Sequence, residues 1–195
     1  IRPTEKGPEI ILSRSDPKFI EALFALEVPE ISSGVVSIKS LAREPGSRTK
    51  MAVQSRDPKV DPVGSCVGQK GTRVQSVLAE IREEKIDIVP YDDDLEKFIA
   101  HSLSPAKAIK VDLNKKKHEA KVTVDEGQVS LAIGKDGQNV RLAAKLTGWK
   151  IDIRALAEKK VVTPEEEEKT SENTEAEPTD TTNNTDPAPD QPTST

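Results

Sequence analysis

The chain has 195 residues, of which 34% are hydrophobic and 32% charged, and its formal net charge is −5. Its single cysteine excludes an internal disulfide, and the presence of only two histidines argues against a Cys/His zinc site. No run approaches about 18 apolar residues, and no basic segment followed by an apolar stretch opens the chain, so neither a membrane span nor a signal peptide is predicted. These features favour a soluble protein of a reducing cytoplasm, and nothing in them predicts a cofactor.

The negative charge is concentrated near the C-terminus. Residues 161–195 contain ten acidic residues against one lysine, a formal charge of −9, whereas residues 1–160 carry +4. High charge with few apolar residues predicts a disordered acidic tail over residues 157–195. Such a tail could compete with a polyanion for a basic face or act as a solubilising spacer, and the sequence leaves both alternatives open.

The first elements are predicted from turn and cap signals. We interpret residues 1–15 as a connector from an upstream domain, and the apolar run 10–13 either as the last strand of that domain or as an edge strand of this chain. Asp16 followed by a proline is typical of a helix N-cap with proline in the first turn. A helix is therefore predicted over 17–27, ended by Pro29.

A hairpin and a second helix follow. The β-type runs 35–42 and 50–55 are joined by a Pro-Gly turn and predict two paired strands. An amphipathic helix is indicated by apolar residues at helical spacing: Val74, Val77, Leu78 and Ile81. Residues 86–89 then alternate as a strand. Including the short apolar segment before the helix, the order is α, β, β, α, α, β.

The same order recurs after Tyr91, which predicts an internal repeat. A capped helix comes first, with apolar residues Leu95, Phe98, Ile99 and Leu103. A hairpin of 108–113 and 120–124 follows. A second helix with Val140, Ala143 and Ala144 and a strand at 151–153 complete the repeat. At an offset of 66, Val63, Gly68, Gly71, Val74 and Val77 match Val129, Gly134, Gly137, Val140 and Ala143. Each repeat is small enough that its core alone would be marginal, so the two are expected to dock.

Each repeat places a Gly-x-x-Gly loop between a short apolar segment and its amphipathic helix. The loops are Gly68-Gln69-Lys70-Gly71 and Gly134-Lys135-Asp136-Gly137. Glycine allows a tight turn there and a close approach of phosphate to the backbone, while the following helix presents free N–H groups. One such loop is weak evidence, but two in matched contexts favour binding of a nucleic-acid backbone.

The element order around the loops is that of prokaryotic-type KH domains, which grip single-stranded nucleic acid with this loop. We therefore predict an α+β fold of two tandem type II KH domains, each a three-stranded sheet packed against helices. The first module spans residues 16–91 and the second module residues 92–156.

Longer stretches resemble one family in particular. The segment from Gln128 to Ile153, which contains the second loop and ends in Gly-Trp-Lys-Ile-Asp-Ile, resembles the second KH domain of the NusA family of bacterial transcription factors. Residues 7–91 resemble the stretch that leaves the S1 domain of that family, together with its first KH domain. The resemblance covers about residues 7–156.

The resemblance implies an S1-like domain and a polymerase-binding domain upstream. It also implies that the KH pair binds single-stranded nascent RNA and influences pausing, termination and antitermination. RNA polymerase and other transcription factors are the partners that it implies for the full-length protein. The residues expected to contact RNA lie in or just after the two loops: Gly68, Gln69, Lys70, Gly71, Thr72, Arg73, Gly134, Lys135, Asp136, Gly137, Gln138, Asn139, Arg141 and Lys145.

Some features favour other interpretations. Asp136 stands where such loops more usually carry a second base, which puts the phosphate contact of the second loop in doubt. No constellation of catalytic residues stands out, so an enzyme is not predicted. The main alternative is a KH-fold protein–protein adaptor with little RNA binding of its own. Trp149 is interpreted as a core residue rather than a stacking platform, and Asp92–Asp94 as helix caps rather than metal ligands.

Overall fold

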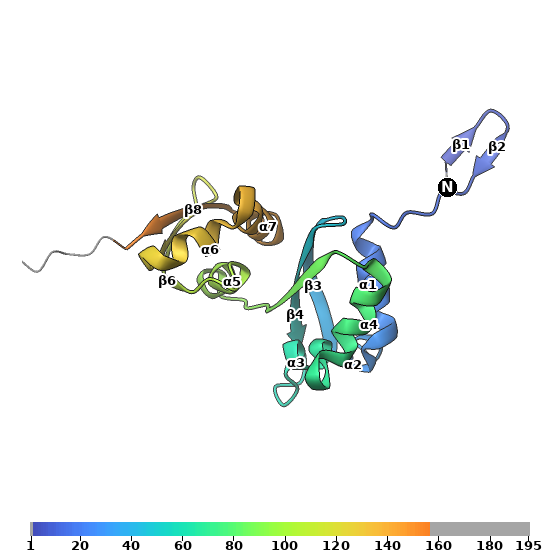
Figure 1. The fold of residues 1–195 in the computed structure, drawn as a ribbon, viewed down its shortest axis with the longest axis horizontal. Helices are drawn as coiled ribbons and strands as arrows, with labels where there is room; N and C mark the ends of the chain where they lie inside the picture. The colour runs from blue at the N-terminus through green and yellow to red at the C-terminus, as the bar shows by residue number, and fades with distance from the viewer. Residues whose placement is uncertain (1, 157–195) are drawn as a thin grey trace, which may run out of the picture. The chain divides into compact units, whose positions relative to one another are not determined.

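The computed structural model describes residues 2–156 (Figure 1). The predicted acidic tail at 157–195 lies outside the described residues. Within the described part, the chain forms a small N-terminal two-stranded sheet and two three-stranded sheets, each with its own helices. No helix among the described residues is both long and apolar enough to cross a membrane.

The first module follows the predicted order, with one extra short helix. Its elements are α1 (Pro17–Glu27), α2 (Pro29–Ser32), β3 (Val36–Glu44), β4 (Arg48–Ser55), α3 (Pro62–Val67), the 3₁₀ turn η1 (Gln69–Gly71), α4 (Thr72–Ile81) and β5 (Lys85–Pro90). The predicted cap of α1 is confirmed, because the Asp16 carboxylate accepts a hydrogen bond of 2.9 Å from the Lys18 N–H. Pro29, predicted only to end this helix, also begins α2.

The second module repeats this order. Its elements are α5 (Leu95–Ser102), β6 (Ala108–Asn114), β7 (Glu119–Val124), the 3₁₀ turn η2 (Glu126–Gln128), α6 (Val129–Ile133), the 3₁₀ turn η3 (Lys135–Gly137), α7 (Gln138–Thr147) and β8 (Lys150–Ala155). Asp94 caps α5 by accepting from the Glu96 N–H at 3.1 Å. The internal repeat predicted from the sequence is therefore confirmed for the helices and strands that the prediction named, while α2 and η2 each occur in one module only.

The two sheets share one topology. In the first, β3 and β4 form the predicted antiparallel hairpin, and β5 adds to β4 in parallel. The second sheet has the same order, β6-β7-β8, with β8 parallel to β7. A parallel partner requires a crossover connection, which the two helices around each glycine loop provide. Each glycine loop therefore lies inside the crossover of its module.

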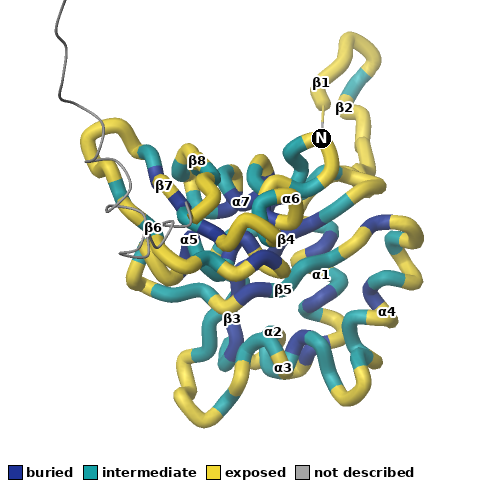
Figure 2. Tube along the Cα trace, turned by 60° about the vertical axis from the view of Figure 1, so that its left-hand side comes forward, coloured by how far each residue is buried: buried dark blue, intermediate teal, exposed yellow. Residues whose placement is uncertain are grey.

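Buried residues form three apolar clusters. One fills the first module and includes Phe24, Met51 and Val77, and a second fills the second module around Val122 and Ala143. Figure 2 shows these buried positions along the strands and helices, with exposed turns between them. The third cluster is shared by both modules: Ala42, Ala52 and Val89 from the first, Phe98, Leu142 and Leu146 from the second, with Tyr91 packed against it. The expected docking of the modules therefore includes an apolar contact.

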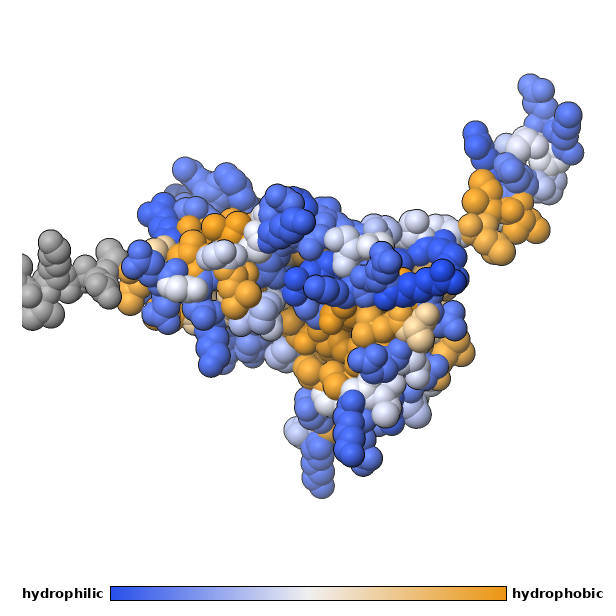
Figure 3. All heavy atoms as spheres, in the orientation of Figure 1, coloured by the Kyte–Doolittle hydropathy of each residue, from blue (hydrophilic) through white to orange (hydrophobic). Residues whose placement is uncertain are grey.

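The prediction of an edge strand at residues 10–13 is wrong. This segment has no regular structure, and the N-terminal sheet instead pairs β1 (Arg2–Thr4) with β2 (Gly7–Glu9). A strand needs a partner, and none pairs with residues 10–13 within the described chain. Leu12 is 92% exposed. Figure 3 shows apolar atoms at the surface of the segment that follows this small sheet.

Candidate nucleic-acid interface

The two glycine loops have the same backbone conformation. Gly68 and Gly134 both have φ near +75° and ψ near 174°. Lys70 and Asp136, the third residues of the loops, have φ of 51° and 52°, and the closing glycines have φ of 77° and 70°. Positive φ at three of the four positions explains why both ends of the loop are glycine, and it means that the side chains of Lys70 and Asp136 at the third position are accommodated only with backbone strain.

The first glycine of each loop is also required by packing. A Cβ on Gly68 would lie 2.8 Å from the Arg73 side chain. A Cβ on Gly134 would lie 2.8 Å from Asn139 Cβ and 2.9 Å from the Asn139 backbone nitrogen. Both contacts are closer than carbon atoms can approach without a shift, and the second one meets the backbone. Each loop is therefore pressed onto the start of its following helix.

Arg73 and Asn139 occupy matched positions and hold the loops from inside. Arg73 donates from Nη1 to the Ser65 carbonyl at 2.6 Å and to the Glu30 carboxylate at 2.9 Å. Asn139, only 2% exposed, donates from Nδ2 to the carbonyls of Leu103 and Ala132, both at 3.0 Å. Both side chains were expected to contact RNA, but here they tie the loop to neighbouring elements of the protein.

The remaining loop side chains are free to meet a ligand. Gln69, Lys70 and Thr72 in the first module and Lys135 and Asp136 in the second are exposed. Neither loop lysine forms an ion pair within the described residues. The helices that follow, α4 and α7, have no acidic residue in their first turns, so nothing there offsets the positive end of the helix dipole. The first loop combines one lysine with no acid, whereas the second combines Lys135 with Asp136.

A hollow lies beside each loop, and the two hollows are at matched places. The one in the first module measures about 630 Å³ and the one in the second about 380 Å³. Six positions related by the repeat line both: Asp61, Gly64, Ser65, Gly68, Gln69 and Arg73 in the first, and Gly127, Ser130, Leu131, Gly134, Lys135 and Asn139 in the second. Volumes in this range can hold a nucleotide-sized ligand.

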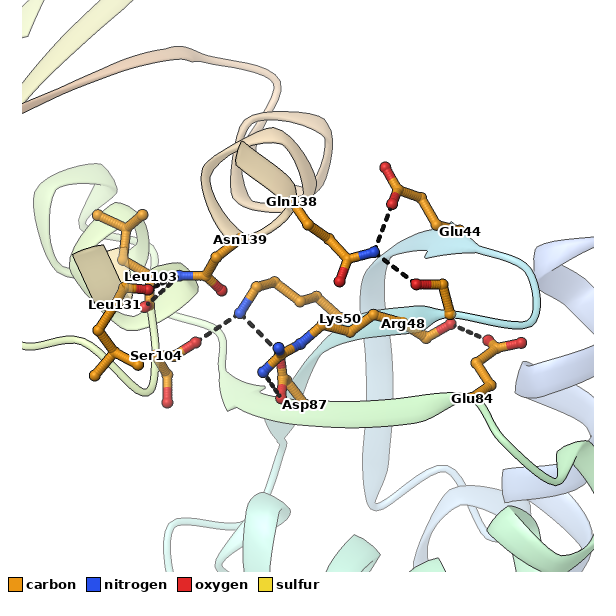
Figure 4. A network of polar contacts seen from close by, with 12 residues as sticks. Glu44, Arg48, Lys50, Glu84, Asp87, Leu103, Ser104, Leu131, Gln138 and Asn139 are labelled. Carbon is orange, nitrogen blue, oxygen red and sulfur yellow. Dashed lines mark hydrogen bonds and ion pairs between the residues drawn. The ribbon is translucent and has the colours of Figure 1, made fainter. Parts of the chain in front are cut away.

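Three other predicted contact residues of the second module, Gln138, Arg141 and Lys145, also contact the first module. Gln138 Nε2 donates to the Glu44 carboxylate at 2.8 Å and to the Ser47 hydroxyl at 2.7 Å. Arg141 Nε donates to Glu44 at 2.7 Å, and Lys145 Nζ lies 4.0 Å from the same carboxylate. Figure 4 shows Gln138 reaching from α7 to the β3–β4 hairpin. These residues therefore join the modules, a role that sequence reasoning missed.

A buried lysine lies at the same junction. The Lys50 side chain is 0% exposed, and Nζ donates to the Ser104 carbonyl at 2.7 Å and pairs with Asp87 at 3.0 Å. Arg48 binds Asp87 through Nε at 2.7 Å and Nη2 at 2.9 Å (Figure 4). Burial lowers the pKa of Lys50, although the charge of Asp87 opposes this effect. The position of Lys50 in a β-type run carried no sign of this burial.

Glu44 offers a test of the junction through pH. The hydrogen bond from Arg141, followed by that from Gln138, lowers the pKa of Glu44 from 4.5 to about 2. Since the pKa is lower in the folded state, the stabilisation is complete above pH 4.5 and is lost as the pH falls toward 2. We expect Glu44→Gln to lower the free energy of unfolding by about 1 kcal/mol at neutral pH, and the difference from wild type to shrink on acidification. Urea denaturation at several pH values measures both.

Glu119→Gln is the matched control for this experiment. Glu119 pairs with Lys150 at 2.9 Å, but both residues belong to the second module and the pair is more exposed. We expect a smaller loss of stability at neutral pH than for Glu44→Gln. Equal losses would show that Glu44 contributes no more than an ordinary surface ion pair.

Other ambiguous residues are also placed by the structure. Trp149 packs against the core cluster of the second module, and its ring centroid lies 5.0 Å from that of His118. The Asp94 carboxylate caps α5, and that of Asp92 accepts a hydrogen bond of 2.8 Å from the Asp94 N–H. Among the described residues, no group of three or more acidic, histidine or cysteine side chains is placed to hold a metal ion. Burial raises the pKa of the Cys66 thiol to about 11, as expected for a core residue.

Comparison with known protein families also identifies two KH domains in this chain. A family model described as the NusA-like first KH domain matches residues 14–91, and one described as the NusA-like second KH domain matches residues 95–161. A solved crystal structure, that of APE1850, superposes with a TM-score of 0.52 at 20% identity, covering 73% of this chain and 100% of that chain. At this identity the match shows a shared fold.

Curated relatives are closer in sequence. The chain is 52% identical over 158 residues to the transcription termination/antitermination protein NusA of Halalkalibacterium halodurans, and 54% identical over 155 residues to that of Bacillus subtilis. The alignments cover 81% and 80% of this chain but only 41% and 42% of the relatives. The family resemblance seen in the glycine loops is thereby confirmed, and the chain belongs to the NusA family as a pair of tandem KH domains.

Proposed function

We propose that this chain binds single-stranded RNA through its two glycine loops. The observation that carries the proposal is the duplicated loop, with identical backbone geometry, exposed lysines and a matched hollow on the same flank. A phosphate approaching either loop would meet first-turn N–H groups and a positive helix end, which are general anion-binding features. Single strands can pass such a loop with their bases unpaired, whereas a duplex cannot.

In the full-length protein, this binding would contact nascent RNA and thereby modulate pausing, termination and antitermination by RNA polymerase in the cytoplasm. The basis is the similarity to the relatives described above, which are transcription termination/antitermination proteins. The function proposed for this chain is binding without catalysis or a cofactor. Contacts with RNA polymerase and other transcription factors are proposed for the full-length protein.

A triple variant tests RNA binding. Gln69→Asp, Lys70→Asp and Lys135→Asp together place acids at exposed loop positions without touching the glycines. We expect affinity for a short single-stranded RNA to fall at least about 30-fold, because two phosphate contacts become repulsive. Fluorescence anisotropy with a labelled single strand and with a matched duplex measures this effect, and wild type is expected to prefer the single strand.

The control is a second triple variant that changes the net charge by the same amount at a site away from the glycine loops. Asn114→Asp, Lys115→Asp and Lys116→Asp also replace one neutral residue and two lysines, at the exposed end of β6 and in the turn that follows it. We expect this variant to keep most of the affinity. An equal loss in both triple variants would mean that binding follows net charge alone, and absence of binding by the wild type would favour the adaptor function.

A further inference from the structure

The hollow beside the second loop contains a residue of the first module. Arg48, at the start of β4, lines it together with Gly134 and Lys135 of the loop and Pro105 of the turn after α5. Figure 4 shows Arg48 and Lys50 reaching side by side from β4 toward the turn that carries Ser104. The second hollow is therefore built by both modules, whereas all residues lining the first hollow belong to the first module.

The two hollows differ in which module supplies the positively charged side chains that line them. In the first hollow, the cations are Lys59, from the connection between β4 and α3, and Arg73. In the second module, the connection between β7 and α6 holds no lysine or arginine, and Asn139 replaces the matched arginine. Only Lys135 of its own module is a cation there. Arg48 thus supplies the second cation that the second module lacks.

The geometry leaves Arg48 able to contact a ligand. Its Nε and Nη2 nitrogens bind Asp87, but Nη1 donates no hydrogen bond within residues 2–156, and the side chain is 25% exposed. No acidic residue lines the second hollow, whereas Glu30 and Asp61 line the first. An arginine held by one carboxylate is pre-oriented, so little side-chain entropy is lost when its free edge binds a phosphate.

The second hollow also has apolar lining residues beside its two cations. Leu131 and Pro105 give it apolar walls against which a nucleobase can pack. A nucleotide combines such a base with a phosphate for the two cations.

We propose that Arg48 of the first module contacts the phosphate of a nucleotide held in the hollow of the second module, so that the second RNA site is complete only when the modules are docked. This inference rests on the proposed RNA binding. It makes Arg48 a nucleotide-binding residue, although it lies far from either glycine loop in the sequence.

Arg48→Gln in the full chain tests the inference. We expect affinity for single-stranded RNA to fall about 10-fold and the slope of log affinity against log salt to decrease by about one, as for loss of one phosphate contact. Arg154→Gln is the control, because Arg154 is also paired with a carboxylate, Asp152 at 3.1 Å, but lies on β8 and does not line the hollow. It is expected to change affinity less than 2-fold, in line with a surface charge distant from RNA.

Arg48→Gln also removes an ion pair of Asp87, so a measurement on the unmodified protein is needed. Phenylglyoxal modifies exposed arginines, and bound RNA should protect Arg48 while leaving Arg154 reactive. Suppose that the wild type binds RNA, but Arg48 reacts with phenylglyoxal equally well in the presence and absence of RNA, or Arg48→Gln and Arg154→Gln bind RNA with the same affinity. Either result would show that the inference about Arg48 is wrong, while the proposed function stands. If the wild type binds no single-stranded RNA, the proposed function itself fails.

Discussion

Gly134→Ala is expected to destabilise the protein by about 3 kcal/mol, one of the largest effects of any single substitution outside the apolar core. Two costs combine in this variant. The backbone at φ +75° and ψ 174° lies in a region that only glycine occupies without strain of about 1–3 kcal/mol. The new Cβ would also lie 2.9 Å from the Asn139 backbone nitrogen, so that α7 must move to make room.

Gly148→Ala is the matched control for that substitution. Gly148 also has a positive φ of +74°, but a Cβ there would meet nothing within 4 Å. It should cost only about 1 kcal/mol, the price of the left-handed conformation. Denaturation followed by the fluorescence of Trp149, the single tryptophan of the chain, compares the two variants. Similar losses of stability would show that the close packing at Gly134 is not limiting.

Leu142→Ala is expected to lower the free energy of unfolding by about 3 kcal/mol and to weaken both modules together. Leu142 is 0% exposed and lies in the cluster shared with Ala52 and Val89 of the first module. Truncating a buried leucine removes apolar burial and leaves a cavity, at a cost of about 2–5 kcal/mol. Because the cavity opens between the modules, each loses part of the support for its marginal core.

The measurement for Leu142→Ala follows each module separately. Trp149 fluorescence reports the second module, and hydrogen exchange of β4 amides reports the first. Leu26→Ala is the control, because Leu26 is 81% exposed on α1 and should cost less than about 0.5 kcal/mol. Destabilisation of the second module with unchanged exchange in β4 would contradict the energetic coupling of the modules.

The candidate site was only partly predictable. The loops themselves were identified because two glycines three positions apart, before an amphipathic helix, form a local pattern that occurs twice. The roles of the residues after the loops were less predictable. Arg73 and Asn139 donate inward, and Gln138 and Arg141 bind Glu44, so proximity to the loop in sequence did not establish which side chains face a ligand. The RNA contacts of the exposed loop residues remain predictions.

The sequence by itself determined the local elements and their duplication. Caps such as Asp16 and Asp94, the turn glycines and the apolar periodicities each act within a few residues, so they can be read without knowing the fold. The tertiary structure alone decided the rest: the parallel pairing of β4 with β5, the burial of Lys50, and the contact of Glu44 with residues 94 and 97 positions away. Such contacts depend on how two separately formed surfaces meet, and no local pattern of charge or hydropathy encodes that meeting.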